Sequence, residues 1–186
     1  MRAFIALELG EEICGRLEVE LLRLRKLAPF ARWVKPESLH LTLAFLGEIA
    51  DAGVPAICEA LAKAARRHAP LNLKVSGNGT FGPLLAPKVL WAGVEGELGA
   101  LAALQADVAA GLAELGHRPD FEQFEPHVTL ARSKNPRGDP ELTRCADALR
   151  GAAFGQVRVG EVALFSSHTD AEGMRYAAIA RCELRR

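Results

Sequence analysis

Two short stretches of nearly the same sequence decide how this chain folds: Leu39-His40-Leu41-Thr42-Leu43 and Pro126-His127-Val128-Thr129-Leu130. In a β-strand, a His and a Thr two residues apart point to one face, and the apolar residues beside them point to the other. One such His is more often a satisfied core residue than a catalyst. Two copies in the two halves of the chain instead indicate a duplicated unit with a polar face.

Hydrophobic periodicity around the two motifs predicts an α+β domain. Apolar runs and alternation predict strands, and apolar residues at helical spacing predict helices. The expected strands are 3–9, 32–34, 39–46, 71–75, 89–94, 127–132, 157–165 and 176–184, and the expected helices are 11–27, 51–68, 98–115 and 140–149. Between 77 and 87, several Gly and Pro residues predict a loop.

No stretch is rich enough in Gly, Ser and Pro to be a free linker. We therefore expect residues 1–186 to form a single bilobal domain of two intertwined lobes with one His-x-Thr motif each. Antiparallel-rich sheets should line a central groove, with the helices outside.

The composition limits the classes of partner. The chain has 186 residues, 49% hydrophobic and 25% charged, with zero formal net charge. This balance argues against a protein held to long nucleic acid by bulk electrostatics, but it is compatible with a short RNA end. Because no run is long enough to span a bilayer and residues 2–9 do not fit a signal peptide, we expect a cytoplasmic protein without a membrane partner.

The sequence resembles the two-histidine phosphoesterase superfamily, and within it the RNA 2',3'-cyclic phosphodiesterase family, also called 2'-5' RNA ligase. The resemblance covers nearly the whole chain, through the segments 2–6, 32–34, 38–47, 89–91, 126–132, 164–166 and 175–176. It implies a bilobal α+β fold with internal pseudo-twofold symmetry. It also implies hydrolysis of a terminal ribose 2',3'-cyclic phosphate to a 2'-phosphate without a metal or other cofactor.

The residues themselves suit that chemistry. Opening a cyclic phosphodiester with water requires one proton to be taken from the water and another to be given to the departing ribose oxygen, on opposite sides of phosphorus. Two imidazoles can do both, because one can be neutral while the other is charged near neutral pH. Thr42 and Thr129 can direct hydroxyls at the non-bridging oxygens. By resemblance, His40 is the general acid and His127 the general base; the residues alone do not order them.

A metal site is the competing use of two His residues. Hydrolytic zinc usually has three protein ligands and a water. Neither motif carries a further His or carboxylate at the spacing that builds such a site on a helix, so we expect no metal.

Five other residues are weaker candidates for substrate binding. Arg132 could hold phosphate, but strict alternation turns it away from His127 unless the strand bulges or ends there. Trp33 and Phe45 could stack on a base, although core packing is the favoured interpretation of both. Lys88 and Arg175 border loops and could contact the RNA backbone or only solvate the surface.

Three functions remain open at this point. The leading hypothesis is a metal-independent enzyme that opens 2',3'-cyclic phosphates on short RNA ends or tRNA fragments, with 2'-5' ligation as the reverse reaction. The second is a noncatalytic module that binds phosphorylated RNA ends. The third is a phosphoesterase that acts on small cyclic nucleotides. We expect a monomer in each case.

Overall fold

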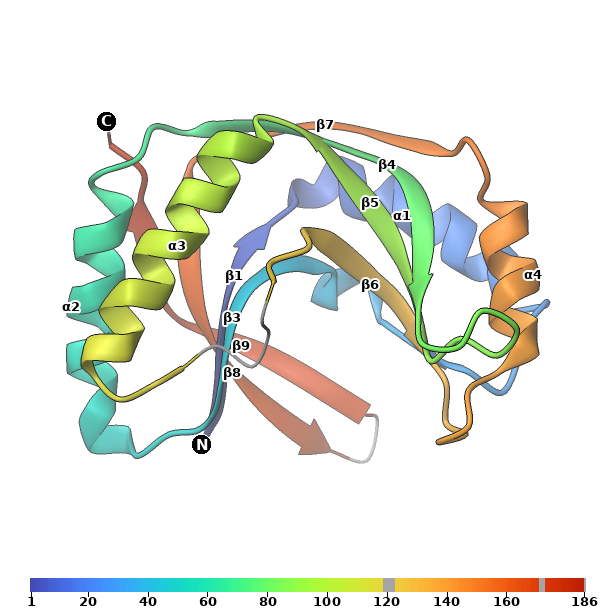
Figure 1. Cartoon of the computed structure of the whole chain (residues 1–186), viewed down its shortest axis with the longest axis horizontal. Helices are drawn as coiled ribbons and strands as arrows, with labels where there is room; N and C mark the ends of the chain where they lie inside the picture. Colours follow the sequence, from blue (N-terminus) through green and yellow to red (C-terminus); the bar gives the residue numbers. More distant parts are fainter. Residues whose placement is uncertain (119–122, 171–172, 186) are drawn as a thin grey trace.

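The computed structural model describes residues 1–118, 123–170 and 173–185, in which one antiparallel sheet is covered by helices (Figure 1). The strands are β1 (Arg2–Glu8), β2 (Arg32–Trp33), β3 (His40–Glu48), β4 (Leu71–Phe81), β5 (Val89–Gly96), β6 (His127–Arg132), β7 (Ala153–Val159), β8 (Glu161–Asp170) and β9 (Gly173–Glu183). The helices are α1 (Gly10–Leu24), α2 (Val54–Ala65), α3 (Leu98–Glu114) and α4 (Pro140–Ala148), with short 3-10 turns at Pro36–Ser38 and Asp51–Gly53.

The order of the strands is symmetric about the centre of the sheet. It runs β7-β4-β5-β6-β3-β1-β8-β9, with β2 beside β6. The two motif strands, β3 and β6, meet in the middle, where Leu41 pairs with Val128. Because these are the middle residues of the two His-x-Thr motifs, the motifs face each other across the centre. The predicted α+β class with a duplicated antiparallel unit is confirmed, and both halves belong to one continuous curled sheet.

The helices cover the outer face of this sheet. Helices α2 and α3 pack on the half that contains β3, β8 and β9, whereas α1 contacts β7 and α4 contacts β4 and β5 in the other half. The main core lies between helices and sheet and includes Leu41, Leu43, Val128 and Leu130. The inner face is therefore left for polar side chains and for a small second apolar cluster of Phe4, Ala6, Ala163 and Phe165.

Most of the expected elements are present, with two differences. Strand β4 continues to Phe81, through a segment expected to be a loop, because its Gly residues lie in a strand that pairs with β5 rather than in turns. The expected strand 157–165 is two strands, β7 and β8, separated at Gly160 and placed in opposite halves of the sheet, β7 at one edge and β8 between β1 and β9. No helix in the described part of the chain is long and apolar enough to cross a membrane.

Candidate active site

His40 and His127 lie on adjacent strands and point to the same inner face of the sheet. The pairing of Leu41 with Val128 places each His opposite the Thr of the other motif. In an antiparallel pair this makes the two His residues diagonal neighbours, with Cα atoms roughly 7–8 Å apart. Burial is the main cause of the lowered pKa of His40, but the charge of His127 is close enough to lower it too. The structure thus brings together the two residues on which the sequence prediction depends.

Each imidazole is oriented by a backbone carbonyl two residues earlier in the chain. Nδ1 of His40 donates to the Ser38 carbonyl at 2.7 Å, and Nδ1 of His127 donates to the Glu125 carbonyl at 2.7 Å. A carbonyl only accepts, so the proton is held on Nδ1 and Nε2 of each ring is left for proton transfer. Both motifs therefore have the same local geometry, as expected for a repeated unit.

Burial lowers the pKa of both His residues below the ordinary imidazole value. The hydrogen bond to the Ser38 carbonyl opposes this for His40, and the hydrogen bond to the Glu125 carbonyl opposes it for His127. The positive charge of Arg132 lowers the pKa of both rings further. In the absence of substrate, the neutral form is thus favoured at both positions. A bound phosphate would raise both pKa values, because an anion stabilises the imidazolium.

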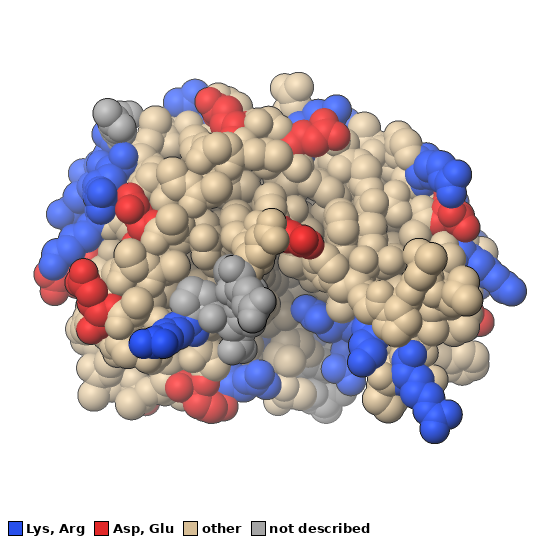
Figure 2. Space-filling view, in the orientation of Figure 1, with Lys and Arg blue, Asp and Glu red and all other residues tan. Residues whose placement is uncertain are grey.

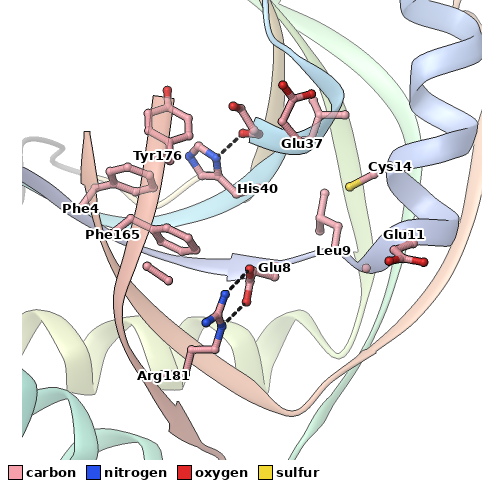
Figure 3. A pocket seen from close by; sticks show the side chains of 14 residues that line it. Phe4, Glu8, Leu9, Glu11, Cys14, Glu37, His40, Phe165, Tyr176 and Arg181 are labelled. Atoms are coloured by element: carbon pink, nitrogen blue, oxygen red, sulfur yellow. Dashed lines mark hydrogen bonds and ion pairs between the residues drawn. The ribbon is translucent and has the colours of Figure 1, made fainter. Parts of the chain in front are cut away.

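Aromatic side chains form the walls around each imidazole. The ring centroid of His40 lies 4.7 Å from that of Phe4 and 5.2 Å from that of Tyr176. Figure 3 labels these three rings beside the hollow. The His127 ring lies 4.9 Å from Phe81 and 6.1 Å from Trp91. None of these four was expected at the site from the sequence. Phe81 lies in the segment expected to be a loop, and Phe4 lies in an expected strand whose facing side the sequence alone did not indicate.

Thr42 and Thr129 share the inner face with the His pair and are half-buried. Neither hydroxyl hydrogen-bonds to another group within the described residues, so both can donate to a ligand. The same part of the chain contains no group of three or more His, Cys, Asp or Glu side chains that could hold a metal ion.

A β-bulge one residue after each Thr changes which face the following residues occupy. In β6, Trp91 pairs with Thr129 but Leu90 pairs with Ala131, so Leu130 is an extra residue. In β3, Ala6 pairs with Thr42 but Ile5 pairs with Ala44, so Leu43 is extra. An extra residue reverses the alternation beyond it. Both leucines and the alanines after them are therefore buried, and the next residue returns to the inner face.

The residues returned to that face are Arg132 and Phe45. Arg132 pairs with Val89, two residues from Trp91 on β5, and its charge acts on both His residues. Phe45 is 42% exposed, with its ring centroid 6.3 Å from that of Phe4. Core packing, the interpretation we favoured for Phe45 from alternation, is wrong, because alternation did not include the bulge. For Arg132, strict alternation pointed away from His127 unless the strand bulged, and the structure has that bulge at Leu130.

The other three candidates lie outside the His pair. Trp33 packs against the main core, and its indole N–H donates to the Ala28 carbonyl at 2.9 Å. Lys88 is exposed just before β5, beside the end of β6. Arg175 is exposed on β9, where alternation with Tyr176 turns it from the inner face. Of the three candidate cations, Arg132 is thus the one whose charge acts on both His residues.

Two hollows adjoin the His pair. One, of about 470 Å³, extends from His40 past Phe165 to the ion pair of Glu8 with Arg181 (Figure 3). The other, of about 250 Å³, is lined by Thr42, Phe45, Phe81, Gln123, Phe124, Glu125 and His127. The inner face is therefore hollow beside each of the two imidazoles.

Comparison with known proteins identifies the family of this chain. The sequence model of the 2'-5' RNA ligase superfamily matches residues 11–171. An RNA 2',3'-cyclic phosphodiesterase of Geobacillus stearothermophilus is 37% identical over 82% of this chain, although the chain spans only 47% of that relative. One of Aquifex aeolicus is 30% identical over 96% of this chain and 95% of its own length.

A solved structure shows the same fold. The crystal structure of a Thermus thermophilus protein superposes with a TM-score of 0.83 and 31% identity, covering 100% of this chain and 98% of that one. The resemblance seen in the sequence is confirmed by these matches. The chain belongs to the 2'-5' RNA ligase superfamily, in its RNA 2',3'-cyclic phosphodiesterase family.

Proposed function

We propose that this chain hydrolyses the 2',3'-cyclic phosphate at the end of an RNA to a 2'-phosphate, with His40 as general acid and His127 as general base and without a metal. The observation that carries the proposal is the placement of both imidazoles on one face, across the pair of Leu41 and Val128. The names of the Geobacillus and Aquifex relatives support the same substrate class.

The reaction needs two proton transfers on opposite sides of phosphorus. Nε2 of His127 takes a proton from the attacking water while the new P–O bond forms. The bond from phosphorus to O3' breaks, and Nε2 of His40 gives its proton to that oxygen, which leaves the phosphate on O2'. The assignment of acid and base to the two positions follows from the family resemblance.

Three further residues stabilise the charge that develops on the phosphoryl oxygens. The hydroxyls of Thr42 and Thr129 lie on the face of the two imidazoles and can each donate a hydrogen bond. Arg132 adds a positive charge and a planar fork of donors that suits phosphate oxygens. A donor placed where charge develops contributes about 100-fold to 1000-fold to a rate.

The same site can catalyse ligation with a different nucleophile. A 5'-hydroxyl of a second RNA would then take the place of water: His127 accepts its proton as the new P–O5' bond forms, the P–O3' bond breaks, and His40 protonates O3', which leaves a 2'-5' linkage. We propose short RNA ends, including tRNA fragments, as substrates of one bilobal domain over residues 1–186, which acts as a monomer in the cytoplasm.

A single assay tests the proposal against its alternatives. An oligonucleotide and a mononucleotide, each with a 2',3'-cyclic phosphate, are incubated with the protein in chelator, and the 2'-phosphate product is measured. We expect turnover that the variants His40→Ala and His127→Ala lose. Binding without turnover would instead indicate a noncatalytic module, and turnover of the mononucleotide alone would indicate a small-nucleotide phosphoesterase.

A further inference from the structure

Three loops meet where β6 ends and form what we call the loop rim: residues 25–31, 82–88 and 133–139. The Ser133 N–H donates to the Lys88 carbonyl at 2.8 Å, and the Asp139 N–H donates to the Pro87 carbonyl at 2.9 Å. Phe30 lines a hollow together with Asn135 and Asp139. The rim is thus a connected surface that begins at the end of β6, the strand that carries His127 and Thr129.

A glycine holds two of these loops in close contact. Gly138 has a φ of +91°, and a Cβ there would overlap the Ala86 carbonyl. A side chain at this position would push the loops apart, so the surface depends on the absence of one.

The rim carries positive charges that no ion pair among the described residues neutralises. Six exposed cations in the rim or directly beside it form no ion pair within the described residues: Lys26, Arg32, Lys88, Arg132, Lys134 and Arg137. Arg32 pairs directly with Arg132 across β2 and β6, although like charges in that position repel. Figure 2 shows Lys and Arg side chains along the lower right edge of the hollow, where Figure 1 places the loops after β4 and β6.

The carboxylate within the three loops, that of Asp139, has a structural role. The Asp139 side chain accepts from the Glu141 N–H at 2.9 Å and caps α4. Because the whole chain has zero net charge, six exposed cations without an ion pair around one rim indicate a local anionic partner.

Large apolar side chains are exposed on the same rim. Phe30 is 76% exposed, Leu84 82% and Leu85 80%, more than any other large hydrophobic residue in the described part of the chain. Unpaired cations beside an exposed aromatic ring are the combination that binds single strands, with cations on the phosphates and the ring on a base.

We propose that the loop rim binds the single-stranded RNA that precedes the cyclic phosphate. This inference rests on the proposed function. A terminal 2',3'-cyclic phosphate at the His pair leaves only one direction for the chain, toward its 5' end. Arg132 belongs to both the site and the rim, so the strand passes from the imidazoles along Arg132 onto the three loops.

The double variant Lys134→Gln/Arg137→Gln tests the proposal. The matched control is Arg158→Gln, because Arg158 on β7 is also an exposed cation without an ion pair among the described residues. The value of kcat/KM is measured for a single-stranded ten-nucleotide RNA and for a mononucleotide, both ending in a 2',3'-cyclic phosphate. We expect the double variant to lose about 10-fold on the RNA and nothing on the mononucleotide. For the RNA, the slope of log kcat/KM against log salt concentration should become shallower by about 1.4, because each phosphate contact on a single strand contributes about 0.7 and the variant removes two.

A second variant tests the apolar part of the rim. Phe30→Ala should fold normally because the ring is 76% exposed, and it should lose about 5-fold or more on the RNA alone if a base stacks there. The proposal would be overturned if kcat/KM fell equally for the RNA and the mononucleotide. It would also be overturned if neither the double variant nor Phe30→Ala lowered kcat/KM for the RNA.

Failure of the proposed function gives a different result. If the wild type turns over neither substrate, binding of the fluorescein-labelled ten-nucleotide RNA is measured by anisotropy. An affinity about 10-fold weaker in the double variant would still support the rim, and an unchanged affinity would overturn it.

Discussion

Arg132→Gln removes the cation that the bulge at Leu130 turns toward the two imidazoles. A unit-charge pair at about 4 Å is worth about 1 kcal/mol in water and about 4 kcal/mol near a protein surface. Arg132 is exposed, but its charge acts on the half-buried rings of His40 and His127, so an intermediate value of about 2.7 kcal/mol applies, which is about 100-fold in rate. Arg132→Lys keeps the charge but loses the planar fork, and we expect a loss of about 10-fold.

The assay is kcat/KM across pH for the cyclic-phosphate mononucleotide, with Arg158→Gln as the control. This ratio reports the pKa values of the free enzyme. Since Arg132 adds to burial in lowering the pKa of both His40 and His127, its removal should move both limbs of the profile to higher pH. An unchanged rate and an unchanged profile in Arg132→Gln would refute the reasoning and make Arg132 a solvated strand end.

Four other predictions concern the site and its supports. His40→Ala and His127→Ala should each remove most turnover, while Thr42→Ala and Thr129→Ala lose about 10-fold to 1000-fold, measured by single-turnover kinetics. The pH profile of kcat/KM for the wild type should be bell-shaped, because the rate falls at acid pH when the general base is protonated and at alkaline pH when the general acid is deprotonated. Burial lowers the pKa of both His residues, so both limbs should lie at lower pH than for free imidazole. Phe45→Ala should raise KM for the mononucleotide without lowering the melting temperature by more than a few degrees, because the ring is exposed on the inner face. Gly79→Ala should lower the melting temperature by about 2–8 °C in calorimetry, since its Cβ would overlap the Trp91 ring.

The sequence was sufficient for the central features of the molecule. Spacing alone placed His40 with Thr42, and His127 with Thr129, on one face of their strands, because side-chain alternation is a local property. Repetition of the motif predicted the pseudo-symmetric sheet, whose centre is the pair of Leu41 and Val128.

What the sequence did not show depends on contacts between strands. The bulges at Leu43 and Leu130 arise from pairing with β1 and β5, so strict alternation placed Phe45 on the wrong face. The extension of β4 to Phe81 likewise comes from pairing with β5, which overrides its glycines. The aromatic walls of the site follow from this pairing and could not be read from spacing.

The proposed mechanism requires the imidazoles of His40 and His127 to bind the same phosphate. NMR titration of both rings with adenosine 2'-phosphate, followed at their Cε1 resonances across pH, tests this requirement most directly. We expect one equivalent to shift the resonances of both rings with a single dissociation constant and to raise both pKa values, because one anion stabilises both imidazolium forms. A response from only one ring, or separate dissociation constants for the two, would contradict it.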